Sequence, residues 1–248
     1  TALAPGQPHS ADAGCIEREL MDRASHNHPL FRDDSATVYY KLEEATRGTT
    51  FSASIKPFQR TKDGRGAYNA HHWKGGPLIQ GNVSGTEVQV VRNPADPDDL
   101  VGHVTQANEV DIETAISAAQ KGFKSWSAIS AEDRAAMLRK VADLYEANTD
   151  ELFALTCREA GKSLSDAVAE IREAVDFAHF YANEGVRYKD SGEAIGPVVC
   201  ISPWNFPLAI FTGQILANLV VGNVVLAKPA EQTALLAVRA VELMYEAG

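Results

Sequence analysis

The arrangement of hydrophobic and polar residues changes character near position 75 of the 248-residue chain. Residues 1–75 are polar and turn-rich, with a possible short helix around CIERELMDRA and one strand-like alternation, TTFSASI. Because such a segment buries little apolar surface, we interpret it as a leader of unassigned or partly disordered structure. Residues 76–248 carry periodic patterns throughout and are predicted to form the folded part of the chain.

A β-hairpin and then a helical region are predicted for the first half of this folded part. Residues 86–107 contain two strand-like runs around an Asn-Pro-Ala-Asp-Pro turn, which is typical of a hairpin. Apolar residues then recur every three or four positions, which predicts helices over 111–126, from Ser130 onward and over 164–178. Gly161 is placed to end a helical stretch before the last of these, because glycine adopts the left-handed conformation readily.

The last 53 residues have the order strand, helix, strand, helix. Two solid apolar runs, Val198–Ile201 and Val224–Ala227, flank a helical stretch at 208–221, and a helix follows from about Thr233. Strands without polar alternation are expected where helices cover both faces, and a crossover helix makes the two strands parallel. The sequence therefore predicts an α/β fold in which the parallel pair follows the hairpin and the helical region.

Ligands of open α/β sheets bind beyond the carboxyl ends of the strands, which directs attention to the loops SPWNFP (202–207) and KPAEQT (228–233). In the second loop, Lys228 and Glu231 place an ammonium beside a carboxylate, a pair suited to the two hydroxyls of a ribose. The alternative is an ordinary exposed ion pair in which Glu231 stabilises the N-terminus of the last helix.

The first loop holds an amide and an indole between two prolines. Asn205 could donate its NH₂ group to an oxygen that becomes negative during a reaction, as in an oxyanion hole. Trp204 could form the wall of a site for a flat ligand, but its residue type favours packing in the core.

Charge and composition narrow the class of function. Lys and Arg number 23 against 33 Asp and Glu, a formal net charge of −10, whereas a nucleic-acid surface requires clustered positive charge. The basic stretch at 56–74 does not offset this balance, so no nucleic-acid partner is predicted. With no run of 18 apolar residues and no signal-peptide pattern, we expect no membrane span and a cytoplasmic location.

Cysteine and histidine spacing gives no sign of a metal site or a disulfide framework. Cys15, Cys157 and Cys200 lie far apart and are odd in number, so we interpret them as reduced thiols. The histidines of SHNHP and NAHHW lack a carboxylate or cysteine cluster at metal-binding spacing. No metal is predicted.

Taken together, the two loops resemble those of the NAD-dependent aldehyde dehydrogenases. SPWNFP is followed 20 residues later by KPAEQT, with FTGQ and GNVVLAKP between them, and CREAGK (157–162) and AEIREAVDF (169–177) add to the likeness. The pattern is most similar to the pyrroline-5-carboxylate (L-glutamate γ-semialdehyde) dehydrogenases, including that half of the bifunctional PutA proteins. The resemblance covers about 75–248 and implies the N-terminal part of a Rossmann-like cofactor domain, with parallel strands joined by crossover helices.

The resemblance also assigns roles to residues of both loops. The four that would line the NAD groove are Ile201, Ser202, Pro203 and Trp204. Lys228 and Glu231 would hold the adenine-side ribose, and Asn205 would supply the side-chain donor of the oxyanion hole. Glu170 would lie near the ammonium of the substrate; the alternative is a solvated glutamate on a helix face.

The family attacks its aldehyde with a cysteine thiolate and uses a glutamate as general base, and the resemblance places both beyond Gly248. We therefore expect a fragment of an enzyme that oxidises L-glutamate γ-semialdehyde to glutamate with NAD in proline catabolism, inactive by itself. The alternative is a non-catalytic dinucleotide-binding or assembly module that forms a homo-oligomer or associates with a full-length homologue through the strands at 85–108 or an exposed sheet edge.

Overall fold

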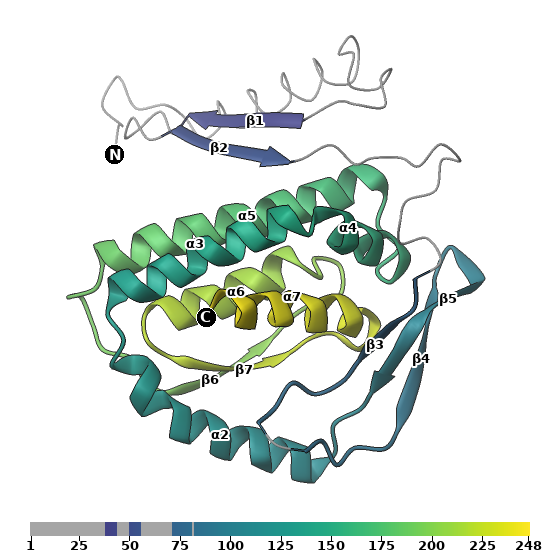
Figure 1. Cartoon of the computed structure of the whole chain (residues 1–248), viewed down its shortest axis with the longest axis horizontal. Coiled ribbons are helices and arrows are strands. Elements are labelled where there is room, and N and C mark those ends of the chain that lie inside the picture. Colours follow the sequence, from purple (N-terminus) through teal and green to yellow (C-terminus); the bar gives the residue numbers. More distant parts are fainter. Residues whose placement is uncertain (1–37, 44–49, 56–70, 81) are drawn as a thin grey trace, which may run out of the picture.

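The computed structural model describes residues 38–43, 50–55, 71–80 and 82–248 (Figure 1). Its strands are β1 (Val38–Glu43), β2 (Thr50–Ile55), β3 (Trp73–Gly75), β4 (Val88–Asn93), β5 (Asp96–Thr105), β6 (Pro197–Ile201) and β7 (Val224–Lys228). Its helices are α2 (Glu109–Ser127), α3 (Ala131–Ala147), α4 (Thr149–Arg158), α5 (Leu164–Arg187), α6 (Ala209–Val220), the short 3₁₀ turn η2 (Glu231–Thr233) and α7 (Ala234–Ala247). The helix expected around CIERELMDRA lies outside the described residues.

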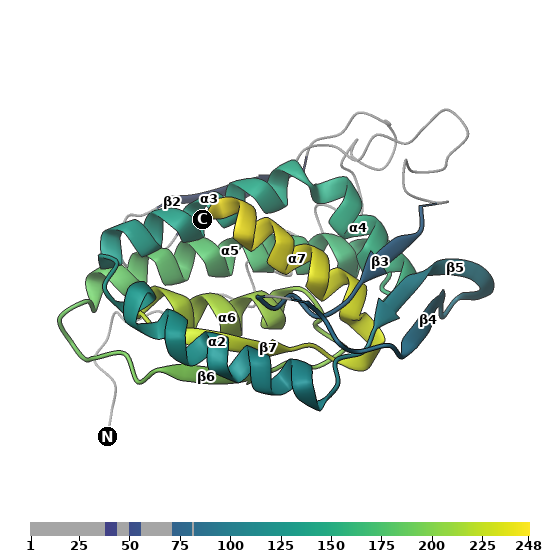
Figure 2. The ribbon, with the colours of Figure 1, turned by 60° about the horizontal axis from the view of Figure 1, so that its bottom comes forward.

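The described elements form a mixed α/β structure with small sheets. Helices α3 and α5 pack side by side as one layer, with α6 against α5 and α7 against α3 (Figures 1 and 2). The two-stranded sheet of β6 and β7 lies between α6 and α2, and the three-stranded sheet, in the order β3-β5-β4, lies beside α7. The apolar core is therefore concentrated between the helices α3 to α7 and the inner faces of the two sheets.

Most of the predicted elements are confirmed. The hairpin forms from β4 and β5, which pair antiparallel, and β6 and β7 pair parallel with α6 between them. At the start of α3, the Ser130 side chain accepts a hydrogen bond from the backbone N–H of Asp133 at 3.0 Å, as expected of a capping residue. The TTFSASI alternation corresponds to β2, which pairs antiparallel with β1.

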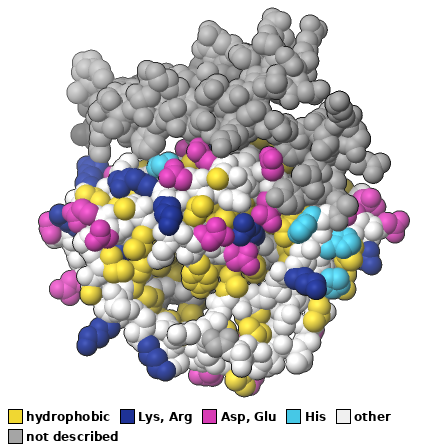
Figure 3. All heavy atoms as spheres, in the orientation of Figure 1, with side chains coloured by type: hydrophobic (Ala, Val, Ile, Leu, Met, Phe, Trp, Pro, Cys, Tyr) yellow, Lys and Arg dark blue, Asp and Glu magenta, His cyan; other side chains and the backbone are white. Residues whose placement is uncertain are grey.

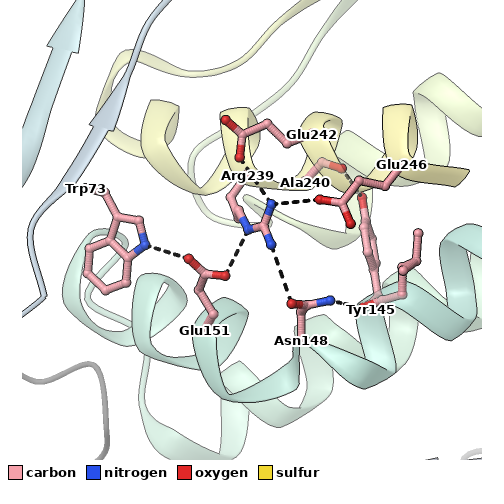
Figure 4. Close-up of polar contacts among 9 residues, drawn as sticks. Trp73, Tyr145, Asn148, Glu151, Arg239, Ala240, Glu242 and Glu246 are labelled. Atoms are coloured by element: carbon pink, nitrogen blue, oxygen red, sulfur yellow. Dashed lines mark hydrogen bonds and ion pairs between the residues drawn. The ribbon is translucent and has the colours of Figure 1, made fainter.

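Residues 73–75, at the end of the segment interpreted as a leader, belong to the three-stranded sheet. Strand β3 pairs parallel with β5, and the Trp73 side chain is 6% exposed. The indole Nε1 of Trp73 donates to Glu151 on α4 at 3.0 Å, and Glu151 also accepts from Arg239 Nε on α7 at 2.8 Å (Figure 4). This chain of contacts ties the sheet to two helices.

Helices lie on both faces of the parallel strands, as expected, but they do not bury β6 completely. Val199 is 60% exposed and Ile201 is 67% exposed, whereas Cys200 between them is buried. One face of β6 packs on α6, and α2, on the other side of the sheet, leaves these two side chains exposed. Because every residue of the run Val198–Ile201 is apolar, the sequence did not indicate which side chains would be buried and which exposed.

The turn between α4 and α5 requires a glycine. Gly161 has φ +68°, and a Cβ built on it would lie 2.7 Å from the Pro94 ring of the β4–β5 hairpin. Just before this turn, Arg158 binds Asp99 of β5 through two nitrogens, at 2.5 and 3.0 Å, and donates to the backbone oxygen of His71 at 2.8 Å. The α4–α5 turn is thus fixed against the three-stranded sheet.

Two buried glutamates hold the N-termini of α6 and α7. Glu159, in the α4–α5 turn, accepts from the backbone N–H groups of Leu235 and Leu236 at 2.8 and 2.7 Å. Glu170, on α5, accepts from those of Leu208 and Ala209 at 3.1 and 3.0 Å. Helix N-termini favour negative charge because their first N–H groups have no partner within the helix.

Replacing Gly161 with alanine is expected to lower the free energy of unfolding by about 1–2 kcal/mol or more, because the left-handed conformation is strained for an L side chain and the new methyl group meets Pro94. Chemical denaturation measures the change. Gly192→Ala is the matched control: a Cβ at Gly192 meets no atom within 4 Å and its φ is not left-handed. Equal effects of the two substitutions would contradict this account of the turn.

Stability is also expected to depend on the ionisation of Glu159. Burial raises the pKa of this carboxyl from 4.5 to about 8, although its two backbone hydrogen bonds act in the opposite direction. The folded chain therefore binds the proton more tightly than the unfolded chain, and the associated stabilisation is lost as the pH rises from about 4.5 to about 8.

Urea denaturation at pH 5 and pH 8.5 tests this dependence. The free energy of unfolding should fall more steeply with pH in the unchanged chain than in Glu159→Gln, which cannot ionise. Parallel pH profiles for the two proteins would count against a raised pKa at this position.

Candidate functional site

The parallel pairing of β6 and β7 brings the two predicted loops to one edge of their sheet. Ile201 and Lys228, the last residues of the two strands, are register partners, and the backbone N–H of Ser202 donates to the Lys228 oxygen at 3.1 Å. The first loop leads from β6 into α6, whose N-terminus binds Glu170. The second leads from β7 into α7, whose N-terminus binds Glu159. Both loops are therefore anchored at their two ends.

In the first loop, the backbone is fixed while its tip faces outward. Ser202 is buried, and its hydroxyl donates to Gln214 Oε1 on α6 at 3.0 Å. Trp204 is 58% exposed and Asn205 is also exposed, before the chain returns to the interior at Pro207. The prediction that Trp204 packs in the core is wrong, because only the two ends of the loop, Ser202 and Pro207, are buried and the residues between them project from the sheet edge.

A lysine from the α4–α5 turn contacts the same loop. Lys162 Nζ lies 4.7 Å from the centroid of the Phe206 ring, within the range of a cation–π interaction. The same ammonium lies 3.3 Å from Glu170 Oε1. Lys162 therefore connects the end of the first loop to the carboxylate that holds the start of α6.

The second loop carries its two charged side chains at the surface. Lys228 Nζ and Glu231 Oε1 are 3.6 Å apart, with side chains 54% and 69% exposed. This is the exposed ion pair of the alternative interpretation. That interpretation also expected Glu231 to stabilise the N-terminus of the last helix, but the N–H groups in the first turn of α7 bind Glu159 instead. Both charges remain accessible to a ligand.

Glu170 is not the solvated helix-face residue of the alternative interpretation, since it is only 2% exposed. Oε2 accepts two backbone hydrogen bonds, whereas Oε1 accepts none and makes the ion pair with Lys162. An ammonium group of a substrate would therefore have to share Oε1 with Lys162. The role of Glu170 toward a substrate stays a prediction.

An apolar groove follows the outer edge of β6. It has a volume of about 620 Å³ and is lined by Val198–Ile201 together with residues of α5 and α6, among them Phe177, Tyr181 and Ile210. A second hollow, of about 810 Å³, lies along the first half of α2. Ile201 lines the β6 groove, whereas Trp204, Asn205, Lys228 and Glu231 line neither hollow.

The described cysteines are poor nucleophiles. Burial raises the pKa of Cys157 on α4 to about 11, and it also raises the pKa of the Cys200 thiol inside β6. Both thiols are therefore protonated at neutral pH, and the thiolate is the reactive form. Cys15 lies outside the described residues, which also contain no group of three His, Cys, Asp or Glu side chains that could hold a metal ion.

Sequence reasoning missed the contributions of Glu159 and Lys162. A signal was present for the glutamate, because Glu159 follows Leu152, Leu155 and Thr156 on the buried face of α4 and continues its three- and four-residue spacing. A carboxylate in an apolar stripe requires a partner. The identity of that partner, a helix 75 residues further along the chain, cannot be inferred from local spacing.

No helix in the described part of the chain combines the length and the apolar character that crossing a membrane requires. On the face shown in Figure 3, acidic side chains alternate with basic ones and apolar atoms appear between them.

Comparison with known proteins identifies the family to which most of this chain is similar. The sequence pattern of the aldehyde dehydrogenase family matches residues 82–248. The bifunctional protein PutA of Klebsiella aerogenes is 49% identical over 181 residues, which cover 72% of this chain and 14% of PutA.

Solved structures give the same result. A 1-pyrroline-5-carboxylate dehydrogenase matches with a TM-score of 0.67 and 36% identity, over 73% of this chain and 38% of that enzyme. A Thermus 1-pyrroline-5-carboxylate dehydrogenase with bound NAD matches with a TM-score of 0.65 and 37% identity, over 71% of this chain and 37% of that enzyme. The chain spans well under half of these relatives, and it belongs to the aldehyde dehydrogenase family.

Proposed function

We propose that this chain forms part of the NAD-binding region of a dehydrogenase that oxidises L-glutamate γ-semialdehyde to glutamate in proline catabolism. In this proposal the described strands and helices are the first part of a Rossmann-like cofactor domain. The observation that carries it is the meeting of two chemically distinctive loops at the carboxyl edge of parallel strands, where α/β sheets bind their ligands. The relatives named above support the choice of cofactor and substrate.

Each proposed role follows from the chemistry of an accessible group. Lys228 and Glu231 supply three N–H donors and a carboxylate acceptor, which suit the two hydroxyls of the adenine-side ribose. Ile201 and Trp204 supply exposed apolar surface for the dinucleotide beside the backbone of Ser202 and Pro203.

Asn205 supplies an exposed amide donor for the oxyanion that forms when the aldehyde is attacked. The chain requires a thiolate from outside the described residues for that attack, because its described thiols are protonated. We therefore infer that the chain provides cofactor binding and oxyanion stabilisation rather than the nucleophile.

Isothermal titration with NAD tests the proposal. We expect binding to the unchanged chain and about tenfold weaker binding for Lys228→Ala and for Glu231→Ala, since each substitution removes hydrogen bonds that involve a charged group. The matched controls are Lys189→Ala and Glu132→Ala, which break another exposed ion pair, of 2.6 Å, that belongs to neither loop. Absence of NAD binding, or equal weakening by the control substitutions, contradicts the proposal.

A second candidate function, that of an assembly module, is favoured by the open edge of β6. Among the described strands β6 pairs only with β7, and its exposed Val199 and Ile201 stand beside the apolar groove. Unpaired strand edges accept further strands. The partner that fits is a strand of a longer aldehyde dehydrogenase chain, since the relatives extend well beyond the region that this chain matches.

Light scattering after size-exclusion chromatography, with a full-length homologue present, tests this second candidate. We expect a complex with the unchanged chain and its loss in Val199→Glu, which places a charge at the strand edge. Ile195→Glu is the control, because Ile195 is 84% exposed and precedes the strand. A chain that stays separate from the homologue rules out assembly through this edge.

A further inference from the structure

The α4–α5 turn, Glu159–Ser163, contacts the starts of both helices that follow the predicted cofactor loops. Glu159 lies in this turn and binds the first amides of α7. Lys162, three residues later, pairs with Glu170, which binds the first amides of α6. One short segment therefore reaches two elements that are separated by a strand and a helix along the chain.

We propose that Glu159 and Glu170 are positioning residues that set the two loops independently, Glu159 the loop 228–233 and Glu170, assisted by Lys162, the loop 202–207. The relevance of this positioning to cofactor binding rests on the function proposed above. The positioning itself depends only on contacts within the chain.

The first argument is the burial of both carboxylates. Glu159 is 4% exposed and Glu170 is 2% exposed, and a polar group removed from water, charged or neutral, is costly unless it is hydrogen-bonded or paired. For Glu159 the partners are the two amides at the start of α7; for Glu170 they are two amides at the start of α6 and the Lys162 ammonium. Displacing either helix start would leave a buried carboxylate without these partners, so each carboxylate opposes movement of its own helix start.

The second argument is that neither helix has a cap of its own. Leu208 before α6 and Thr233 before α7 make no side-chain hydrogen bond to the first turn. By contrast, α3 and α5 begin at Ser130 and Ser163, which cap their own helices. The two helices that begin at the candidate site thus depend on acceptors that come from other parts of the chain.

The third argument is that the turn supplying Glu159 and Lys162 is itself held in place. Arg158, directly before Glu159, makes a two-nitrogen contact with Asp99 on β5, and Gly161 is packed against Pro94. Glu159 is therefore presented from a turn that is itself fixed to the three-stranded sheet, and Glu170, on α5, is tied to the same turn through Lys162. Lys162 adds a contact with the Phe206 ring in the first loop, which extends the restraint from the helix start into the loop.

Hydrogen exchange of backbone amides, followed by NMR on the full chain, tests the proposal. Methionine replaces a glutamate at similar length but offers no oxygen acceptor. Glu159→Met should accelerate exchange at Leu235 and Leu236 by about tenfold or more and leave Leu208 and Ala209 unchanged. Glu170→Met should have the reverse effect on the two pairs of amides.

Further variants separate positioning from general loss of stability. The glutamine variants retain one acceptor oxygen and replace the other with an NH₂ group, so each should shift exchange in the same pair of amides by a smaller factor. If a methionine variant does not fold, the glutamine variant at the same position provides the hydrogen-exchange test instead. Lys162→Met should affect only the amides of Leu208 and Ala209, and Lys189→Met, in an exposed ion pair, should affect neither pair.

The result that overturns the proposal is equal acceleration of both pairs of amides by either glutamate substitution, or no acceleration of the pair that the glutamate binds. Titration of the same variants with NAD distinguishes this failure from failure of the proposed function. Selective exchange without NAD binding to any form supports positioning and contradicts the cofactor assignment. NAD binding without selective exchange contradicts positioning alone.

Discussion

Parallel pairing of β6 with β7 is the constraint on which the rest of the candidate site depends. Parallel strands cannot be joined by a tight turn, so the chain must return through α6 before the second strand begins. With Ile201 opposite Lys228, both strand ends then lie at the same edge, and the residues that follow them become neighbours. An antiparallel pair would have sent the two loops to opposite edges of the sheet.

The helix starts beyond these loops impose a second constraint, because their buried backbone N–H groups need hydrogen-bond acceptors. Buried N–H groups require acceptors, and buried carboxylates require donors, so Glu159 and Glu170 meet both needs at once. The restraint acts on the backbone and leaves the side chains of Trp204, Lys228 and Glu231 exposed. A loop whose ends are fixed and whose side chains are accessible is suited to binding a ligand with little loss of conformational entropy.

Much of the fold could be predicted from the sequence because the signals were local. The helix start at Ser130, the turn at Gly161 and the β4–β5 hairpin each depend on a few adjacent residues, and each is confirmed. The wrong predictions concern burial. The residue type of Trp204 favours the core, yet the indole is exposed, because exposure depends on which elements pack over a loop and not on the loop itself.

The sequence by itself determined the order of the elements, the chemistry of the two loops and the family resemblance, since all three are written in short stretches of residues. Tertiary structure alone decided that Glu159 and Glu170 bind helix starts far along the chain, that Lys162 reaches Phe206, and that Val199 and Ile201 of β6 stay exposed. These outcomes depend on contacts between residues separated by tens of positions. No local pattern specifies which distant N–H group or ring a buried or half-buried charge will meet.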